Sequence, residues 1–446
     1  MVTPRTMPGV LELLPAEQVA FNRMLATIRS VFERFGYLPI ETPAIELTDI
    51  LLTKTGGDTE RQVYLVQSTG SIDQGRAPDL ALPFDLTVPL ARYVAEHEHD
   101  LSFPFRRYQI QKVYRGESPQ RGRFREFYQC DVDVIDRDTL NLGHDAEVVA
   151  IIDAVFEALR LGDFTIRINN RKLMRGVLER HGVIDPELQA ATLREVDKLA
   201  KRGRQAVSIS IGELGVGDDA TTGLMDFVAR GALSRQEAAS FLGSIDAPGP
   251  LLREGIAEVA TVLATVSALG VPDDRFVFDP AIARGLDYYT GTVYETTLDA
   301  HPEIGSICSG GRYDDLAGLY TSTRLPGVGL SIGFTRLFWQ LREAGLLAAA
   351  DSSVVAIVTL MDQEGLDYAI SVATRLREAG INTAAVLEAG KLGKQLKQAD
   401  RIGIRFALIA GTEERAAGTV TIKDLFNQTQ EEVAVADAAG FILAND

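Results

Sequence analysis

The sequence has 446 residues, with 62 Asp and Glu against 45 Lys and Arg, which gives a formal net charge of −17. This acidity argues against a continuous positive surface made for non-specific nucleic-acid or membrane binding, but it permits a local basic patch. With 46% hydrophobic and 24% charged residues, the composition is that of a globular protein and not of a disordered chain. At about 100–200 residues per domain, the length predicts two to four domains.

Only two cysteines occur, Cys130 and Cys308. They are too few for a disulfide framework or a cysteine-based zinc site, so we expect a reducing compartment and a cytoplasmic protein. No apolar stretch approaches the roughly 18 residues of a membrane span, and no secretory signal is apparent, so no membrane partner is expected. His97 and His99 lie in an acidic run that is more typical of a solvated turn than of a metal site.

The first part of the chain predicts a helix, an extended segment and a hairpin. Apolar residues at three- and four-residue steps predict an amphipathic helix over 15–36. Two prolines in Tyr37–Ile45 favour an edge strand or an extended interface segment. Two alternating runs, 108–114 and 124–135, flank a loop rich in Gly and Pro, and therefore predict a long antiparallel hairpin.

The chain after the hairpin can be divided into segments by the periodicity of its apolar residues. A helix over 143–161 and a strand over 164–169 precede a block, 171–270, in which helical periodicity dominates. Strand and glycine patterning then resumes, which indicates that the helical block is an insertion. Beyond a plausible boundary at 345–352, predicted strands and helices alternate as in a small α/β domain. The strands are 354–360, 383–387, 406–410 and 420–422, and the helices are 363–379 and 391–402.

The densest chemical signal is the segment Arg106–Arg125, which holds seven cations against one acid. One interpretation is a solvated hairpin face whose cations pair with nearby acids. We favour an anion site, because arginines on a rigid hairpin can fork onto phosphate oxygens. Strand alternation places Arg123, Arg125, Phe127 and Gln129 on one face, and Asp131 and Asp133 continue it. Cations followed by carboxylates can bind a zwitterion next to a polyanion.

Three glycine-bearing segments accompany the hairpin: Ala283–Gly291, Ser309–Asp314 and Gly327–Leu337. Glycine pairs let the backbone approach a ligand closely, but they also form simple bulges, and a Tyr pair is more often core than ligand-binding. The last segment is neither a Walker loop nor a dinucleotide fingerprint. An antiparallel hairpin with clustered arginines therefore fits phosphate chemistry better than either common nucleotide fold.

The order of these segments resembles the class II aminoacyl-tRNA synthetases, and within them the histidyl-tRNA synthetase family. Tyr37–Ile45 resembles motif 1, the hairpin Val113–Asp133 resembles motif 2 and Gly329–Leu337 resembles motif 3. The segments Arg284–Tyr289 and Ser309–Asp314 resemble the two signatures of the histidine-specific family. The resemblance covers nearly the whole chain.

The resemblance implies an α+β catalytic domain built on an antiparallel sheet, with a helical insertion, followed by a C-terminal α/β anticodon-binding domain. The expected limits are 1–170 for the first part of the catalytic domain and 171–270 for the insertion. The second part of the catalytic domain is expected at 271–345, and the anticodon-binding domain at 352–446. The family's motif 1 also implies a homodimer.

The implied activity is a histidine–tRNA ligase that activates L-histidine with ATP and transfers it to tRNA-His, with Mg²⁺ bridging the phosphates and no ligand assigned to it. Catalysis would rest on positioning and charge stabilisation, without a protein nucleophile. The resemblance assigns Arg115 to the α-phosphate, Arg284 to the histidine carboxylate and α-phosphate, and Arg336 to the γ-phosphate. Arg123 joins Arg115 and Arg336 as an ATP-binding residue.

For histidine, the resemblance assigns Asp85, Thr87 and Gln129 to the ammonium group. It assigns Asp133 and Tyr289 to the imidazole, with Tyr288 lining the pocket. The Asp85-Leu86-Thr87 triplet departs from the Glu-Gly-Thr of many bacterial members. The anionic role survives that change.

For tRNA, Gln120 and Arg121 would approach the acceptor end. A basic helix face would read the anticodon, unless that helix is simply a solvated surface element. Its residues are Lys391, Lys394, Lys397 and Arg401. The alternative function is a paralogue that does not charge tRNA, such as the ATP phosphoribosyltransferase regulatory subunit. Such paralogues tend to lose the arginines and the C-terminal domain that this chain keeps.

Overall fold

The computed structural model describes residues 2–52, 62–118, 122–283, 288–314, 317–318, 320–347 and 352–445. The chain forms two compact units. The first comprises Met1–Leu11 and Ala26–Leu346, and the second comprises Glu12–Leu25 and Leu347–Asp446. Among the described residues, no helix is both long and apolar enough to cross a membrane. The limits predicted for the separate domains remain predictions.

The first unit is built on an eight-stranded sheet in the order β1-β5-β6-β11-β10-β9-β7-β8. The sheet is antiparallel except where β1 pairs with β5 and β7 pairs with β8 at its two edges. In sheet order, the strands are β1 (Leu38–Pro39), β5 (Phe105–Tyr114), β6 (Glu126–Ile135), β11 (Gly327–Ile332), β10 (Ser306–Tyr313), β9 (Thr292–Leu298), β7 (Phe164–Asn170) and β8 (Phe276–Phe278). The antiparallel catalytic sheet is therefore confirmed.

The hairpin prediction is confirmed next to the β1 edge of this sheet. Strands β5 and β6 pair over ten residues each, from Phe105 opposite Ile135 to Tyr114 opposite Glu126. The predicted edge strand is β1, whose residues Leu38 and Pro39 are both exposed. A three-stranded sheet in the order β2-β4-β3 lies beside these elements, with β2 at Glu46–Leu47, β4 at Leu80–Ala81 and β3 at Leu65–Val66.

Outside the helical block, the part of the chain before the second unit has seven described helical segments, and the longest of those that were not predicted is α4. No helix was predicted between the extended segment and the hairpin, yet Thr87–Glu96 forms helix α4. Helix α4 begins where the Asp85 carboxylate accepts a hydrogen bond from the Val88 backbone N–H, a local cap that hydrophobic periodicity does not reveal. The described segments are α1 (Pro15–Arg34), α2 (Thr48–Leu51), α3 (Thr69–Asp73), α4, α5 (Gly143–Leu159), η2 (Pro302–Ile304) and α12 (Phe334–Glu343).

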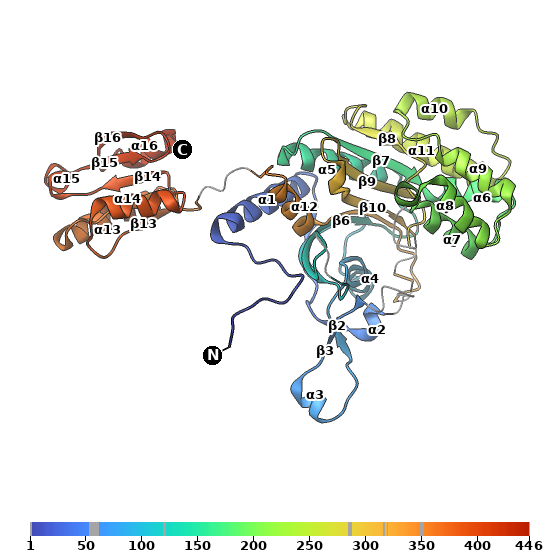
Figure 1. Ribbon diagram of the computed structural model, residues 1–446, viewed down its shortest axis with the longest axis horizontal. Coiled ribbons are helices and arrows are strands. Elements are labelled where there is room, and N and C mark those ends of the chain that lie inside the picture. Colours follow the sequence, from blue (N-terminus) through green and yellow to red (C-terminus); the bar gives the residue numbers. More distant parts are fainter. Residues whose placement is uncertain are drawn as a thin grey trace. The chain divides into compact units, whose positions relative to one another are not determined.

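The block predicted as helical is helical throughout its described elements and packs at the β7–β8 end of the sheet (Figure 1). Gly176 and Gly255 allow α6 and α11 to pack closely, because a side chain at Gly255 would meet the Leu173 backbone at 2.3 Å. The helices are α6 (Arg171–Arg180), α7 (Pro186–Val196), α8 (Leu199–Glu213), α9 (Asp218–Val228), α10 (Arg235–Gly243) and α11 (Pro250–Ala268).

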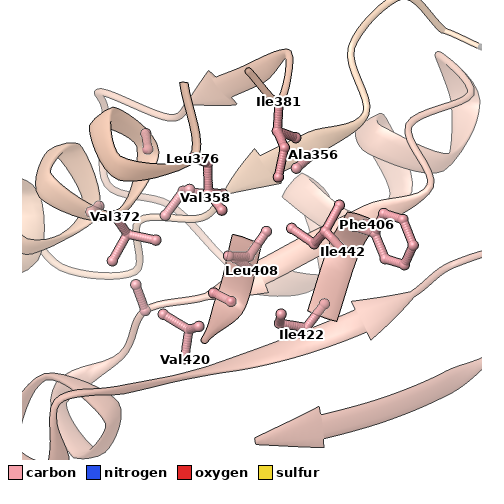
Figure 2. Packing of buried hydrophobic residues seen from close by; sticks show 14 of the residues in the cluster. Ala356, Val358, Val372, Leu376, Ile381, Phe406, Leu408, Val420, Ile422 and Ile442 are labelled. Carbon is pink, nitrogen blue, oxygen red and sulfur yellow. The ribbon is translucent and has the colours of Figure 1, made fainter. Parts of the chain in front are cut away.

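The second unit contains a five-stranded sheet in the order β13-β12-β14-β15-β16. Aliphatic side chains from α13 and α16, including Val372, Leu376 and Ile442, pack against β12, β14 and β15 (Figure 2). The elements are β12 (Ala356–Val358), η3 (Gln363–Gly365), α13 (Leu366–Glu378), β13 (Thr383–Ala385), α14 (Leu392–Arg401), β14 (Phe406–Ile409), α15 (Thr412–Ala417), β15 (Thr419–Asp424), β16 (Thr429–Ala434) and α16 (Ala438–Asn445). The α/β character predicted here is confirmed.

Candidate active site

A cavity of about 800 Å³ opens on the face of the large sheet formed by β6, β10 and β11. Its wall also includes the start of α4, the start of α12 and the loop after β5. It brings together nine residues that the sequence analysis proposed for the site: Asp85, Thr87, Arg115, Arg123, Gln129, Asp133, Tyr288, Tyr289 and Arg336. Three further proposed residues, Gln120, Arg121 and Arg284, lie outside the described residues.

Strand β6 supplies the floor of the cavity through its alternation. Phe127, Gln129, Asp131 and Asp133 all line the cavity, as side chains two residues apart on one strand should. Arg125 was predicted to share this face, and this prediction is wrong. Strand β6 begins only at Glu126, and the Arg125 side chain turns to donate hydrogen bonds to the carbonyls of Glu117 and Pro8.

Asp133 is held from two sides by buried groups. Its Oδ2 lies 2.6 Å from Nη2 of Arg107, and its Oδ1 accepts a hydrogen bond of 2.8 Å from the Tyr313 hydroxyl. Burial raises the pKa of Asp133 to about 6, against the opposing effects of Arg107 and Tyr313. Both carboxylate oxygens are therefore oriented before any ligand arrives.

Asp85 and Thr87 enter the cavity at the beginning of α4. Asp85 is 3% exposed, and burial raises the pKa of its carboxyl group, while the Val88 backbone N–H and the charge of Arg115 oppose that rise. Its Oδ2 has no hydrogen-bond partner among the described residues. The arrangement leaves one carboxylate oxygen for a ligand and uses the other to start a helix.

Two tyrosines also line the cavity. The rings of Tyr288 and Tyr289 meet edge to face with their centroids 4.8 Å apart, and Tyr288 meets Tyr313 in the same way at 6.3 Å. Burial raises the pKa of Tyr289, so its hydroxyl stays protonated and can act as donor or acceptor. Gly311 makes room for this ring, because an added Cβ there would lie 2.9 Å from Tyr289.

Three arginines line the cavity and are more exposed than its carboxylates. The Nε of Arg115 donates a hydrogen bond of 3.1 Å to the Phe84 carbonyl, and its guanidinium lies 5.0 Å from the Phe127 ring centroid. Arg336 donates to the Ile304 carbonyl at 3.1 Å. These contacts fix the guanidinium planes at the cavity wall. Arg123 lies 3.4 Å from Glu117, and its side chain is half exposed.

The cations of Arg106–Arg125 fall into two groups, and each of the two interpretations given above applies to one group. Arg106 pairs with Glu147, Arg107 with Asp133 and Lys112 with Glu126, so these three cations compensate acids of the fold. Arg115 and Arg123 line the cavity. An anion site therefore accounts for only part of the run.

The signature segment Ser309–Asp314 combines cavity residues with a structural one. Ser309, Gly310, Gly311 and Tyr313 line the cavity, but Arg312 points away from it. The Arg312 guanidinium donates to both oxygens of Asp145 and is only 5% exposed. This buried pair attaches β10 to α5.

Sequence reasoning did not place three cavity residues in the site. Asp131 lies on the predicted face of β6 but was not assigned a role there. Asp197 and Lys201 reach the cavity wall from the helical block. The alternation of β6 contained the signal for Asp131. Spacing along the chain gave no signal for the other two, because their place depends on how the helical block packs.

In the second unit, the predicted basic face lies on α14 and at its start. Lys391 is the residue that precedes the helix, and Lys394, Lys397 and Arg401 follow at steps of three and four. All four side chains are exposed. The helix therefore presents a row of cations to solvent.

Comparisons with known proteins match both units. Residues 9–337 match the family model described as histidyl-tRNA synthetase, and residues 353–445 match the anticodon binding domain. A histidine–tRNA ligase of Xanthomonas oryzae is 57% identical, with 99% of this chain and 98% of the relative covered. One from Xylella fastidiosa is 58% identical, with 97% and 96% covered.

A solved structure shows the same architecture. The crystal structure of histidyl-tRNA synthetase from Nostoc has a TM-score of 0.91 and 40% sequence identity, and the match covers 100% of both chains. The antiparallel sheet, the cavity on its face and the C-terminal unit thus occur together with full-length sequence similarity. This chain belongs to the histidyl-tRNA synthetase family.

Proposed function

We propose that this chain is a histidine–tRNA ligase, which forms histidyl-adenylate from histidine and ATP and then esterifies tRNA-His. The observation that carries the proposal is the charge distribution of the cavity, whose carboxylates are buried and whose arginines are more exposed. A zwitterionic amino acid bound beside a polyphosphate needs this order of charges. Full-length relatives that are histidine–tRNA ligases support the same activity.

Histidine recognition follows from the acceptors on the floor. Asp85, Thr87 and Gln129 receive the ammonium group, because an ammonium ion donates three hydrogen bonds and accepts none. Asp133 and Tyr289 face the two imidazole nitrogens, and Tyr288 lines the ring pocket. Because Arg107 and Tyr313 already orient Asp133, little rotamer freedom is lost when the substrate binds. An analogue that lacks either ring nitrogen would leave a buried polar group unpaired.

The chemical step requires positioned charge and no protein nucleophile. The histidine carboxylate attacks the α-phosphorus of ATP, the bond to the bridging oxygen breaks, and pyrophosphate leaves. Arg115 stabilises the α-phosphate and Arg336 the γ-phosphate end, with Arg123 nearby. Arg284 holds the carboxylate and the α-phosphate together, although its position lies outside the described residues.

We include Mg²⁺ as a companion of ATP. Among the described residues, no group of three or more His, Cys, Asp or Glu side chains forms a metal site. This fits an ion carried mainly by phosphate oxygens with one or two protein carboxylates. The ion would neutralise charge on the pyrophosphate that leaves. No residue is assigned to it.

The tRNA contacts fall on two parts of the chain. Gln120 and Arg121, which lie outside the described residues, would approach the acceptor end. The row of four cations on and before α14 would bind the anticodon arm. Its exposure supports this role, because a phosphate contact needs a cation that solvent can reach.

We further propose a homodimer and a cytoplasmic location. Strand β1 is an edge of the large sheet, and Leu38 on it is 65% exposed; nearby Ile45 and Leu47 are 47% and 50% exposed. Apolar side chains at an open edge favour association. Sedimentation of the wild-type protein and of Leu38→Glu tests this, and a wild-type monomer would overturn the dimer. Two buried free cysteines fit a reducing compartment.

The decisive experiment is ATP–pyrophosphate exchange with each standard amino acid, followed by charging of tRNA-His. Exchange should depend on histidine, and Arg284→Ala should abolish it while the oligomeric state is kept. Exchange that does not depend on histidine, or the absence of exchange, would overturn the proposed ligase activity and favour the non-charging paralogue. That paralogue has no specific support here, because the match to the ligases extends through the C-terminal unit.

A further inference from the structure

Among the described residues, the floor of the cavity holds more buried carboxylates than buried cations. Asp85, Asp131 and Asp133 are 3%, 3% and 5% exposed, and all three line the cavity. Arg107, which is fully buried, forms an ion pair with Asp133. Three carboxylates facing one fully buried guanidinium leave room for a cation that is not part of the protein.

The three acids differ in how their oxygens are occupied. Asp133 has both oxygens engaged by Arg107 and Tyr313. Asp85 and Asp131 each have one oxygen, Oδ2 and Oδ1 respectively, that has no hydrogen-bond partner in the described part of the chain. The two acids repel each other through the cavity, and this contributes to the raised pKa of Asp131.

A hydrogen bond fixes a third acceptor beside them. The Nε2 of Gln129 donates a hydrogen bond of 2.7 Å to Oγ of Ser331. Because the amide nitrogen of Gln129 is used in this way, its Oε1 is left without a partner among the described residues. The cavity thus presents three buried, unpaired acceptors on Asp85, Gln129 and Asp131.

We propose that Asp131 is a further substrate-binding residue, whose Oδ1 accepts a hydrogen bond from the α-ammonium group of histidine beside Asp85 and Gln129. This inference rests on the proposed function. An ammonium group has three N–H donors and one positive charge, which matches three acceptors and an uncompensated carboxylate. Asp131 lies between Gln129 and Asp133 on β6, and hence between the groups for the ammonium and for the imidazole.

The first test compares Asp131→Asn with the wild type in histidine-dependent exchange. A hydrogen bond to a charged group contributes about 1.5–3 kcal/mol, so the KM for histidine should rise about 10- to 150-fold. The KM for ATP should stay close to the wild-type value. Asp136→Asn is the matched control, because Asp136 follows β6, does not line the cavity and accepts at its Oδ1 from the Arg137 backbone N–H. It should leave both constants unchanged.

The second test uses two competitive inhibitors to separate the ends of the substrate. Histidinol keeps the ammonium group, whereas imidazolepropionate lacks it and keeps the ring. Asp131→Asn should weaken the binding of histidinol by the same factor as the binding of histidine. It should leave the inhibition constant of imidazolepropionate nearly unchanged. An equal loss for both inhibitors would assign Asp131 to the ring or to the framework and would overturn the inference.

Folding and function are separated by two further measurements. Asp131→Asn removes one of three crowded buried carboxylates, so its melting temperature should equal or exceed that of the wild type. A lower melting temperature with unchanged histidine affinity would show a structural role. Calorimetric titration with histidine repeats the comparison without ATP. A wild-type protein that binds histidine but shows no exchange would overturn the proposed function and leave this inference intact.

Discussion

Nη2 of Arg107 lies 2.6 Å from Oδ2 of Asp133, in an ion pair that is buried on both sides. The two residues face each other across β5 and β6, because the register of the hairpin pairs Arg107 with Asp133. A carboxylate in this place is costly without its cation, since removing one partner of a buried pair leaves an uncompensated charge. The pair therefore determines both the stability of the hairpin and the orientation of Asp133 toward the ligand.

Arg107→Met should lower the free energy of unfolding by about 3–5 kcal/mol. Adding Asp133→Asn should recover most of the lost free energy of unfolding, because the second substitution removes the uncompensated carboxylate charge. Histidine binding should not recover in the double variant, since the neutral amide no longer offers an oriented carboxylate. Urea unfolding and the KM for histidine measure the two effects separately. A double variant that is less stable than Arg107→Met would show that the pair is not the cause.

Gly329→Ala should disable histidine binding through a steric effect on the same carboxylate. An added Cβ would lie 2.2 Å from Oδ1 of Asp133 and 2.4 Å from the Val132 carbonyl. No real Cβ tolerates such contacts, so Asp133 or the strand must move. Gly212→Ala is the matched control, because nothing lies within 4 Å of its added Cβ in helix α8. The control should gain up to about 1 kcal/mol of stability. Calorimetric titration with histidine, together with melting temperatures, separates the two outcomes.

Much of this arrangement was predictable from periodicity. The hairpin and the helical block follow from apolar spacing, and the alternation of β6 places Gln129 and Asp133 on one face. The edge strand follows from its two prolines. Two errors have local causes. Helix α4 starts from a side-chain cap at Asp85, and Arg125 lies one residue before β6 begins. Neither feature leaves a repeating signal in the sequence.

Other features depend on contacts that are distant along the chain. Strand β16 was not predicted, because its Thr-Gln-Glu-Glu run is exposed and polar and only its pairing with β15 makes it a strand. Nothing in the sequence around Arg312 distinguished it from a ligand-binding arginine. Its partner Asp145 lies 167 residues away. The separation of structural from ligand-facing cations therefore needed the tertiary structure.

The melting temperature of Asp131→Asn relative to the wild type should depend on pH. Burial raises the pKa of Asp131 from 3.8 to about 7, so the folded wild type binds this proton more tightly than the unfolded chain. Ionising the carboxyl group therefore costs folding stability progressively as the pH rises from about 4 to about 7. The variant escapes that cost, so its advantage should grow over this interval and level off above it. A difference that is constant with pH would contradict the burial of an ionisable Asp131.

Arg115→Ala should lower the rate of exchange about 10²- to 10³-fold, the loss typical for a group that stabilises transition-state charge. Lys112→Ala is the matched control from the same hairpin. Its ammonium group pairs with Glu126 at 2.7 Å outside the cavity, and its side chain is 41% exposed. A pair of this kind contributes about 0–1 kcal/mol to stability and nothing to the phosphate site. Equal losses in the two variants would mean that the hairpin, and not the cavity arginine, limits the rate.

Lys394→Glu on α14 should weaken the binding of tRNA-His without changing histidine-dependent exchange, because activation takes place in the other unit. The exposed cation contributes through release of counterions from tRNA phosphates. Its loss should reduce the slope of log affinity against log salt by about one unit per phosphate contact. Arg375→Glu reverses the charge of an exposed residue on α13 of the same unit, and it therefore controls for the change in net charge. Nitrocellulose filter binding at several salt concentrations gives both slopes. Identical slopes for the two variants would show that the overall charge of the unit acts on tRNA, and would remove the specific role of the α14 face.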